Sequence, residues 1–456
     1  MHPEHDERAL ADRLREALDH QDAAALHGLF AQIQPGEKAR LLSRLDPPEV
    51  NGVLGLLAPE AAAELVREVP AAQAVGLIAT LAPEAAAAVL ELLPSDQQAD
   101  LLGDLDESHA EAILAELEPE QARIARELTR YPDDVAGGLM VHEYLAYPES
   151  ATVSEVVDDL VANAESYRDF EVQYAYVTGR DSRLAGVLQL RDLLLARRDQ
   201  VVRELMIADP VTVEETATLD ELRALFDRKP FVGVPVVDRR RQLLGIVRRG
   251  DLRKALAERS TSDYLKSLGI VGGEELRSMP VALRSRRRLA WLSINIGLNV
   301  VAASVIALHQ ETIAAVVALA VFLPIISDMS GCAGNQAVAV SMRELSLGLA
   351  RPREVLRVWA QEISVGMING VVLGVLIGLV AWLWQESLTL GIVVGGAMAL
   401  NTVIAVSIGG TVPLLLRRIG VDPALAAGPV LTTITDMCGF LLLLSFAAAV
   451  LPRLTG

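Results

Sequence analysis

The last third of the chain consists of long apolar segments with few charges, and this pattern restricts it to a membrane-spanning fold. Residues 289–456 contain 8 acidic and 7 basic residues, whereas residues 1–130 contain 25 acidic and 10 basic ones. A helix of about 20 mostly apolar residues crosses a bilayer. We therefore predict an all-α membrane domain over residues 289–456. Its five spanning segments, the second of which also holds a loop, are residues 289–310, 312–342, 363–385, 387–416 and 423–452.

The arginines near the ends of these segments fall on one side of a five-span arrangement, and the other side has none before Arg453. The positive-inside rule then places the N-terminus in the cytoplasm and the C-terminus outside. The polar N-terminal segment has no signal-peptide pattern. The chain also has no G-x-x-x-x-G-K-[ST] phosphate loop, which argues against a transport ATPase with its own motor.

One carboxylate interrupts the last apolar segment. Asp436 is the only charged residue between Asp422 and Arg453. An ionised carboxylate inside a bilayer is costly unless it meets water, a cation or a partner, so it marks a functional site. On a helix, the oxygens of Thr432 and Thr435 and the gap at Gly439 would share its face. Oxygen ligands without Cys or His suit Mg²⁺, Ca²⁺ or Mn²⁺.

The soluble part divides into an acidic helical region and a mixed α/β region. Within residues 1–130, prolines recur about every 12 residues and precede short Ala/Leu-rich runs, which predicts a superhelical array of short helices. Residues 131–258 contain two similar βαβ-like halves, 131–200 and 201–258. Residues 259–288 would form a polar connecting helix. The net charge of −15 in residues 1–130 argues against nucleic acid as a partner and suits a region that meets cations.

The two α/β halves resemble a tandem pair of CBS domains. The resemblance rests on the order of their elements and on two similar ends, Gly186–Asp192 and Gly245–Asp251. In CBS pairs an aspartate at this position often binds the ribose of an adenine nucleotide. The resemblance therefore implies ATP or another adenine nucleotide at Asp192 and Asp251. Gln189 and Arg248 replace the usual Ser or Thr of the motif.

The whole domain order resembles the MgtE family of magnesium channels and transporters. Three stretches carry the likeness: Tyr131–Met140, Phe322–Gln336 and Asp422–Asp436. The family implies Mg²⁺-selective uptake across the bacterial inner membrane, with no enzymatic activity. The aspartate that matches Asp436 would hold hydrated Mg²⁺ in a pore on a dimer axis. The resemblance and the residue chemistry together give the other pore-lining candidates as Asp328, Gly331, Gly334, Asn335, Thr432, Thr435 and Gly439.

Charge balance gives an independent reason to expect a homodimer. One Asp436 per chain cannot neutralise a divalent cation, whereas a two-fold axis through the pore supplies two carboxylates. The family also implies that cytoplasmic Mg²⁺ closes the pore by binding between acidic faces. In this chain, Asp251, Glu258 and Asp263 match that regulatory cluster. Because Gly250, Arg259 and Ser262 stand where acidic residues are common, we predict weaker or altered Mg²⁺ gating.

Two other functions remain open from the sequence. The chain could transport another divalent ion, such as Mn²⁺ or Co²⁺, through the same site. It could instead be a non-conducting membrane sensor whose CBS pair binds a nucleotide. No nucleophile–base pair or His-rich metal cluster supports an intramembrane enzyme.

Overall fold

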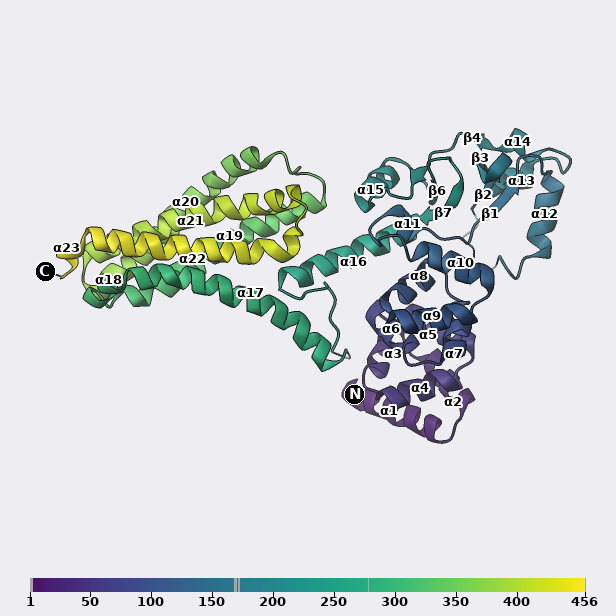
Figure 1. Cartoon of the computed structure of the whole chain (residues 1–456), viewed down its shortest axis with the longest axis horizontal. Helices are drawn as coiled ribbons and strands as arrows, with labels where there is room; N and C mark the ends of the chain where they lie inside the picture. Colours follow the sequence, from purple (N-terminus) through teal and green to yellow (C-terminus); the bar gives the residue numbers. More distant parts are fainter. Residues whose placement is uncertain (1–2, 168–169, 171–172, 278, 456) are drawn as a thin grey trace. The chain divides into compact units, whose positions relative to one another are not determined.

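The computed structural model describes residues 3–167, 170, 173–277 and 279–455 (Figure 1). The chain forms two compact units. The first contains the residues up to Arg259 together with Leu276–Met279, and the second contains Ser260–Glu275 and the residues from Pro280 onward. The predicted fold class is confirmed: a helical N-terminal region, an α/β pair with two small sheets, and a helical membrane region.

The N-terminal region is a stack of short helices, most of which begin at or just after a proline. Pro59, Pro83 and Pro119 occupy the first helical turn, where the missing N–H needs no partner. Pro70 and Pro94 each lie one position earlier, as N-cap residues. The helices are α1 (Pro3–Asp19), α2 (Ala23–Gln32), α3 (Pro35–Leu42), α4 (Pro47–Leu56), α5 (Pro59–Glu68), α6 (Ala71–Ile78), α7 (Pro83–Leu90), α8 (Ser95–Asp104), α9 (Glu107–Glu116) and α10 (Pro119–Leu128).

These helices pack on their second neighbours in the chain, which makes a two-layered array. α3 contacts α5, α5 contacts α7 and α7 contacts α9, while α4, α6, α8 and α10 form the other row. One continuous core of Leu, Val, Ile and Ala side chains runs between the rows. A helix of 8 to 10 residues is unstable alone in water, so this shared burial is what holds the array together.

The α/β region contains two sheets built on the same plan. In the first sheet β1 pairs in parallel with β2, which pairs antiparallel with β3, and β4 follows at the edge. In the second, β5, β6 and β7 repeat the parallel and then antiparallel pairing. The elements are α11 (Ala136–Leu139), β1 (Leu145–Pro148), α12 (Val153–Ala162), β2 (Tyr174–Thr178), η1 (Arg180–Ser182), β3 (Leu184–Gln189), α13 (Leu190–Leu195), α14 (Val202–Leu205), β4 (Ile207–Ala208), β5 (Val213–Glu214), α15 (Leu219–Arg228), β6 (Gly233–Val237), β7 (Leu243–Arg248) and α16 (Arg249–Ser267).

The register of the two sheets supports their origin as a repeat. The ladder between β2 and β3 shifts at Val177/Thr178, and the ladder between β6 and β7 shifts at Val236/Val237. Bulges are retained features of a fold rather than random defects, so an irregularity at the same place in each hairpin indicates that the two halves share one fold. The prediction of two similar α/β halves is therefore confirmed.

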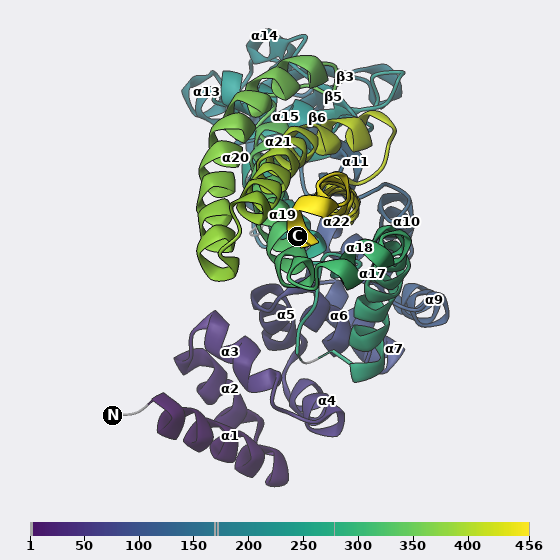
Figure 2. The same ribbon diagram turned by 90° about the vertical axis from the view of Figure 1, so that its left-hand side faces the viewer.

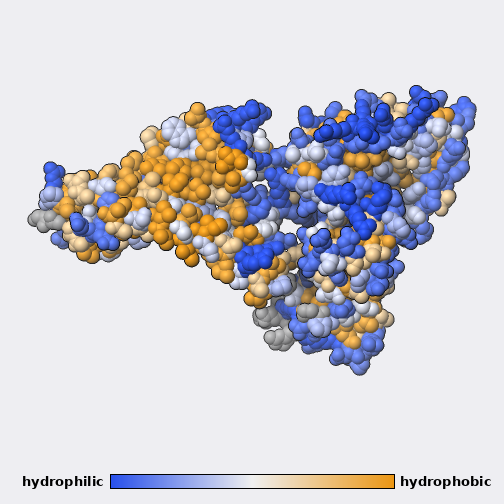
Figure 3. Space-filling model, in the orientation of Figure 1, coloured by the Kyte–Doolittle hydropathy of each residue, from blue (hydrophilic) through white to orange (hydrophobic). Residues whose placement is uncertain are grey.

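The membrane unit is formed by long helices with an apolar surface (Figure 3). Among the described residues, α17, α20, α21 and α22 are long and apolar enough to cross a membrane. α19 is also long, and it packs against α21 and α22. Figure 2 shows α20 beside α21, with α17 on the other side of the group. The helices are α17 (Val281–Leu308), α18 (Gln310–Ala315), α19 (Leu319–Ser346), α20 (Val355–Gln385), α21 (Leu388–Arg418), α22 (Pro423–Ala449) and α23 (Leu451–Thr455).

The segment 312–342 is predicted to hold one span and a loop, and a break in the helical chain lies within it, between α18 and α19. Residues 322–336 are helical throughout, and Gly331 and Gly334 both lie inside α19. A helix satisfies its own backbone, which is decisive in a membrane where an irregular segment lacks water.

A line of glycines on α20 allows close packing against α21 in the membrane unit. A Cβ atom added at Gly370 would lie 2.5 Å from the Ala399 carbonyl oxygen on α21, and one at Gly374 would lie 2.6 Å from that of Gly395. These are backbone atoms, which cannot turn aside. Gly370 and Gly374 therefore permit close helix approach against α21 of the same chain.

Replacing Gly370 with alanine should separate α20 from α21. We expect Gly370→Ala to destabilise the protein by about 1–3 kcal/mol, as overpacking does. The melting temperature of the detergent-solubilised protein would fall, as measured by heating followed by size-exclusion chromatography. Gly297→Ala is the matched control, because nothing lies within 4 Å of the Cβ position at Gly297. Equal melting temperatures for the two variants would contradict this account of the packing.

Candidate functional site

Asp436 lies in the middle of α22 and is held by a residue of another helix. The helix begins at Pro423, with Asp422 as its N-cap accepting a 2.9 Å hydrogen bond from the Ala424 N–H. Ser327 of α19 donates its hydroxyl to Asp436 Oδ1 at 2.5 Å. The Asp436 side chain is partly exposed. A membrane carboxylate thus keeps one oxygen bonded inside the protein and remains accessible from outside it.

The predicted neighbours of Asp436 on α22 fall into two groups. Thr432 is partly exposed like Asp436, whereas Thr435 and Gly439 are buried. On the buried side, Asn401 Nδ2 of α21 donates to the Thr435 carbonyl at 3.1 Å. A Cβ at Gly439 would lie 2.7 Å from that same nitrogen. Within one chain, Gly439 therefore makes room for Asn401.

The predicted residues of α19 also separate by helix face. Asp328 and Asn335 are exposed, while Gly331 and Gly334 are buried. A Cβ at Gly334 would lie 3.0 Å from the Ala405 carbonyl oxygen, so this glycine permits α19 to pack on α21. The exposed face carries a carboxylate and amides in an otherwise apolar unit. Such a face requires water or a protein partner, since lipid satisfies neither.

Ser327 and Asn401 were not found from the sequence. Each lies in a segment where serine or asparagine gives no periodic signal, and its role depends on a partner more than 30 positions away. Asn401 is fully buried and its Oδ1 atom has no partner within the described part of the chain. Nor do those residues include three His, Cys, Asp or Glu side chains placed to hold one metal ion.

A second group of carboxylates lies in the first unit, where α8 faces the second α/β half. Burial raises the pKa of Asp96 to about 6, and repulsion from Asp251 adds to the effect. Burial also raises the pKa of Asp100 to about 7, with further repulsion from Asp133. Glu258 repels Asp100 as well. These acids are held together against their mutual repulsion, an arrangement that a cation would relieve.

The N-terminus of α8 is fixed by the segment that leads into β1. Glu143 accepts hydrogen bonds from the Ser95 N–H and the Ser95 hydroxyl, both at 2.9 Å. The His142 N–H donates to Ser95 Oγ at 2.9 Å. A carboxylate at the N-terminus of a helix accepts hydrogen bonds from the free N–H groups there and is stabilised by the positive end of the helix dipole. This contact sets the position of Asp96, the next residue, against the α/β region.

The predicted regulatory and nucleotide residues already have partners. Arg248 Nε bonds Asp251 at 2.5 Å, and Lys254 pairs with Glu258 at 3.8 Å. The structure thus brings Asp251 and Glu258 close to the acids of α8. Asp263 lies further along α16, in the second unit.

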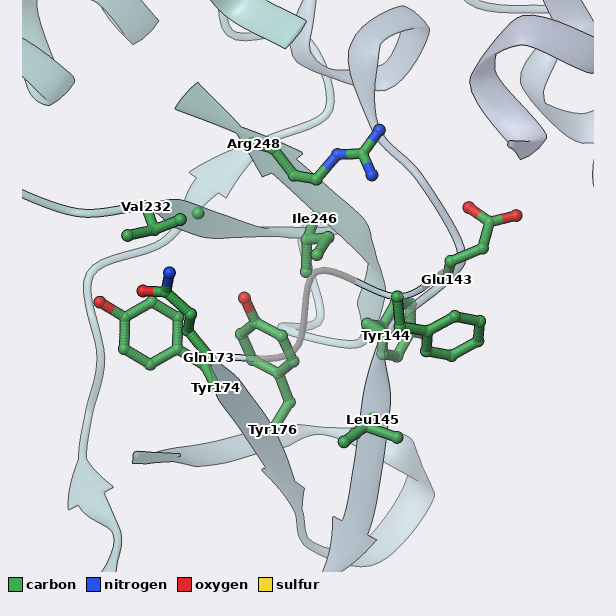
Figure 4. A pocket seen from close by; sticks show the side chains of 11 residues that line it. Glu143, Tyr144, Leu145, Gln173, Tyr174, Tyr176, Val232, Ile246 and Arg248 are labelled. Atoms are coloured by element: carbon green, nitrogen blue, oxygen red, sulfur yellow. The ribbon is translucent and has the colours of Figure 1, made fainter. Parts of the chain in front are cut away.

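Asp192, the other predicted nucleotide residue, lies on α13 and pairs with Arg191 at 3.4 Å. It does not line the cleft between the two α/β halves. That cleft is aromatic on one side (Figure 4). The rings of Tyr144 and Tyr176 meet edge to face with centroids 5.9 Å apart. The cleft is lined by Glu143, Tyr144, Leu145, Phe170, Gln173, Tyr174, Tyr176, Val232, Gly233, Ile246 and Arg248.

Comparison with known proteins identifies all three parts of the chain. Residues 323–446 match the MgtE divalent cation transporter model, residues 33–134 match the MgtE intracellular N domain, and residues 202–258 match the CBS domain. The magnesium transporter MgtE of Bacillus subtilis is 30% identical over 340 residues, which cover 75% of each chain. That of Thermus thermophilus is 36% identical over 339 residues, or 74% of each. This chain belongs to the MgtE family of magnesium transporters.

The family membership makes the protein a multi-pass membrane transporter with an intracellular N domain rather than an enzyme. Among solved structures, the cytosolic domain of the Mg²⁺ channel MgtE in complex with ATP is 33% identical, with a TM-score of 0.48, and covers 54% of this chain and 99% of that one. The soluble part of a magnesium transporter is 25% identical, with a TM-score of 0.48, and covers 56% and 99%.

Proposed function

We propose that this MgtE transporter admits Mg²⁺ into the cytoplasm through a passage lined by Asp436. The observation that carries the proposal is a carboxylate in a membrane helix that is partly exposed and bonded through only one oxygen to Ser327. A divalent ion that moves down 100 mV gains about 4.6 kcal/mol, twice the gain of a single charge. The gradient is therefore sufficient to drive uptake.

The ion would pass with its water shell and between two copies of the chain. Mg²⁺ gives up water reluctantly and prefers octahedral oxygen ligands. One Asp436 balances half of its charge, whereas a symmetric pair balances all of it. The exposed polar face of α19, with Asp328 and Asn335, supports the same arrangement, because a second copy and the water between them would cover it. Homodimerisation is thus part of the proposal.

We also propose that α19 is the fifth spanning helix, with the N-terminus in the cytoplasm and the C-terminus outside a bacterial inner membrane. α19 is less apolar than its neighbours because of Asp328 and Asn335 on the face assigned to the passage. The exposed tryptophans Trp359, Trp382 and Trp384 lie near the two ends of α20, where aromatic side chains favour the membrane interface.

Removing the membrane carboxylate should stop transport. We expect Asp436→Asn to reduce Mg²⁺ flux into proteoliposomes, followed with an enclosed Mg²⁺-sensitive dye, to the level of empty liposomes. The neutral amide no longer offsets the cost of bringing a divalent ion into the membrane. Glu386→Gln, at the exposed end of α20, is the control and should keep normal flux.

The same assay separates the competing functions. Asp436-dependent flux with preference for Mn²⁺ or Co²⁺ over Mg²⁺ in competition would assign a different cargo. Flux in the wild type that survives in Asp436→Asn would refute the proposed pathway. A wild type that never conducts would favour a membrane sensor.

The acids around α8 would form the cytoplasmic Mg²⁺ sensor. Asp96 and Asp100 repel Asp251, Asp133 and Glu258, and an ion that bridges them stabilises whichever state of the transporter holds them together. Lys254 is a built-in cation beside Asp100. Arg259 approaches Asp220 at 3.9 Å and occupies a position where family members often carry an acid. Both bases support the expectation of weaker gating by Mg²⁺.

Neutralising the sensor should weaken inhibition and remove its dependence on pH. We expect Asp96→Asn/Asp100→Asn to need at least about 5-fold more cytoplasmic Mg²⁺ to halve the open probability, within the usual range of allosteric coupling. Because the folded pKa values of about 6 and about 7 exceed the usual 3.8, Asp100 loses its charge as the pH falls through about 7 and Asp96 as it falls through about 6. Protons should displace Mg²⁺ as the cytoplasmic pH falls from 8 to 6, so wild-type inhibition weakens over that window.

Single-channel recording with controlled cytoplasmic Mg²⁺ and pH measures both effects. Glu60→Gln removes an exposed acid at the start of α5 and should behave as the wild type. Unchanged inhibition in the double variant would move the sensor elsewhere. Steep inhibition at low Mg²⁺ in the wild type would contradict the expected weakening of the gate.

A second ligand, an adenine nucleotide, fits the cleft between the two α/β halves. Tyr174 lines it opposite Arg248 (Figure 4), so a base would stack on aromatic rings and phosphates would meet a guanidinium. We expect Tyr174→Ala to weaken ATP binding to the purified full-length protein by about 1–3 kcal/mol in isothermal titration. Tyr147→Phe, which removes a hydroxyl bonded to Asp159, should leave binding unchanged. The absence of wild-type binding would remove nucleotide from the proposal.

A further inference from the structure

We propose that Ser327 is a positioning residue for ion recognition: its hydroxyl fixes the Asp436 carboxylate so that the second oxygen faces the passing ion. This inference rests on the proposed role of Asp436. The observation behind it is the contact from Ser327 Oγ to Asp436 Oδ1, at 2.5 Å between α19 and α22.

The other hydroxyls of the membrane helices show how unusual this contact is. A serine or threonine in a helix usually donates to a carbonyl three or four positions earlier in its own helix. Ser330 does so to Ile326, and Thr432 and Thr433 do so to Pro429. The same bond is made by Ser304, Ser364, Thr402, Ser407, Thr411 and Thr435.

Ser327 instead bonds a charged group on another helix. Among the described membrane hydroxyls, Ser341 also reaches across, to the Gly410 carbonyl, but it meets a neutral backbone atom. A serine hydroxyl can always bond a carbonyl of its own helix. Exchanging that carbonyl for an acceptor on another helix is most favourable when the new acceptor is ionised, because hydrogen bonds to charged groups are about twice as strong. The contact is therefore matched to a charged Asp436.

The packing on both sides of the contact fixes the distance between α19 and α22. A Cβ at Gly439 would lie 3.3 Å from Ile326 Cγ2, next to Ser327 in the chain. Further along α19, a Cβ at Gly334 would lie 2.8 Å from Leu431 Cδ2 of α22. The short Ser327 side chain spans the remaining gap to Asp436 because these two glycines allow the helices to approach.

The hydroxyl acts on the ion through the carboxylate. By occupying Oδ1 it restricts rotation of the carboxyl group and leaves Oδ2 to accept hydrogen bonds from the water shell of Mg²⁺. A residue that orients a group in contact with a metal typically changes metal affinity by about 10-fold to 100-fold when it is removed. The serine should thus determine the concentration at which Mg²⁺ saturates transport more than the maximal rate.

The test compares Ser327 variants with Ser330→Ala, which removes a buried hydroxyl from the same helix one turn away. In proteoliposomes, Ser327→Ala and Ser327→Cys should raise the half-saturating Mg²⁺ concentration by about 10-fold or more, while maximal flux changes less. Ser327→Thr keeps the hydroxyl and should restore the wild-type value. Ser330→Ala should also resemble the wild type.

Asp436→Asn is measured in parallel so that the two proposals fail separately. If Asp436→Asn conducts normally, the proposed pathway is wrong and the inference falls with it. If Asp436→Asn is inactive but Ser327→Ala saturates as the wild type does, the pathway stands and the positioning role is refuted. An equal shift in Ser327→Thr or Ser330→Ala would also refute it, because the change would then not follow the hydroxyl. If Ser327→Ala does not elute as folded protein in size-exclusion chromatography, Ser327→Cys takes its place in the test. Its thiol has a similar size to the hydroxyl but is only a weak hydrogen-bond donor.

Discussion

The cost of placing a carboxylate in a membrane is the constraint on which the rest of the structure depends. Asp436 lies in an apolar helix. Its hydrogen bond from Ser327 replaces only part of the hydration that the carboxylate would have outside the membrane. The rest of this free-energy cost is offset only where water or a cation reaches the other carboxylate oxygen. The small residues around it, Gly334 and Gly439, bring three helices close enough to hold this group in one orientation.

The same electrostatics operates in the first unit with the opposite consequence. Burial is the main cause of the raised pKa values of Asp96 and Asp100, and repulsion from the neighbouring acids adds to it. A cation bound between these acids would lower that repulsion. Asp436, in contrast, has few alternatives to a cation. One site is suited to sensing Mg²⁺ and the other to passing it.

The sequence allowed prediction of those features that one segment determines alone. The membrane helices followed from long apolar runs, the helical array from regularly spaced prolines, and Asp436 from its isolation among apolar residues. Features that need two distant segments were missed. The hydrogen bond of Ser327 to Asp436 forms only when α19 packs on α22. The interaction of Asp96 with Asp251 likewise arises only when α8 packs on the α/β region.

The segment from the end of α16 to α17 is attached to the membrane helices by two sets of ion pairs. Lys266 pairs at 3.0 Å with Asp422, the N-cap of the helix that carries Asp436. Both side chains are partly exposed, so the pair contributes at most about 1 kcal/mol. Glu275 holds the following segment to α17 through Arg284 and Arg288. The exposed Lys266–Asp422 pair is therefore the weaker of the two attachments, and the pair that involves the shielded Glu275 carboxylate is the stronger one.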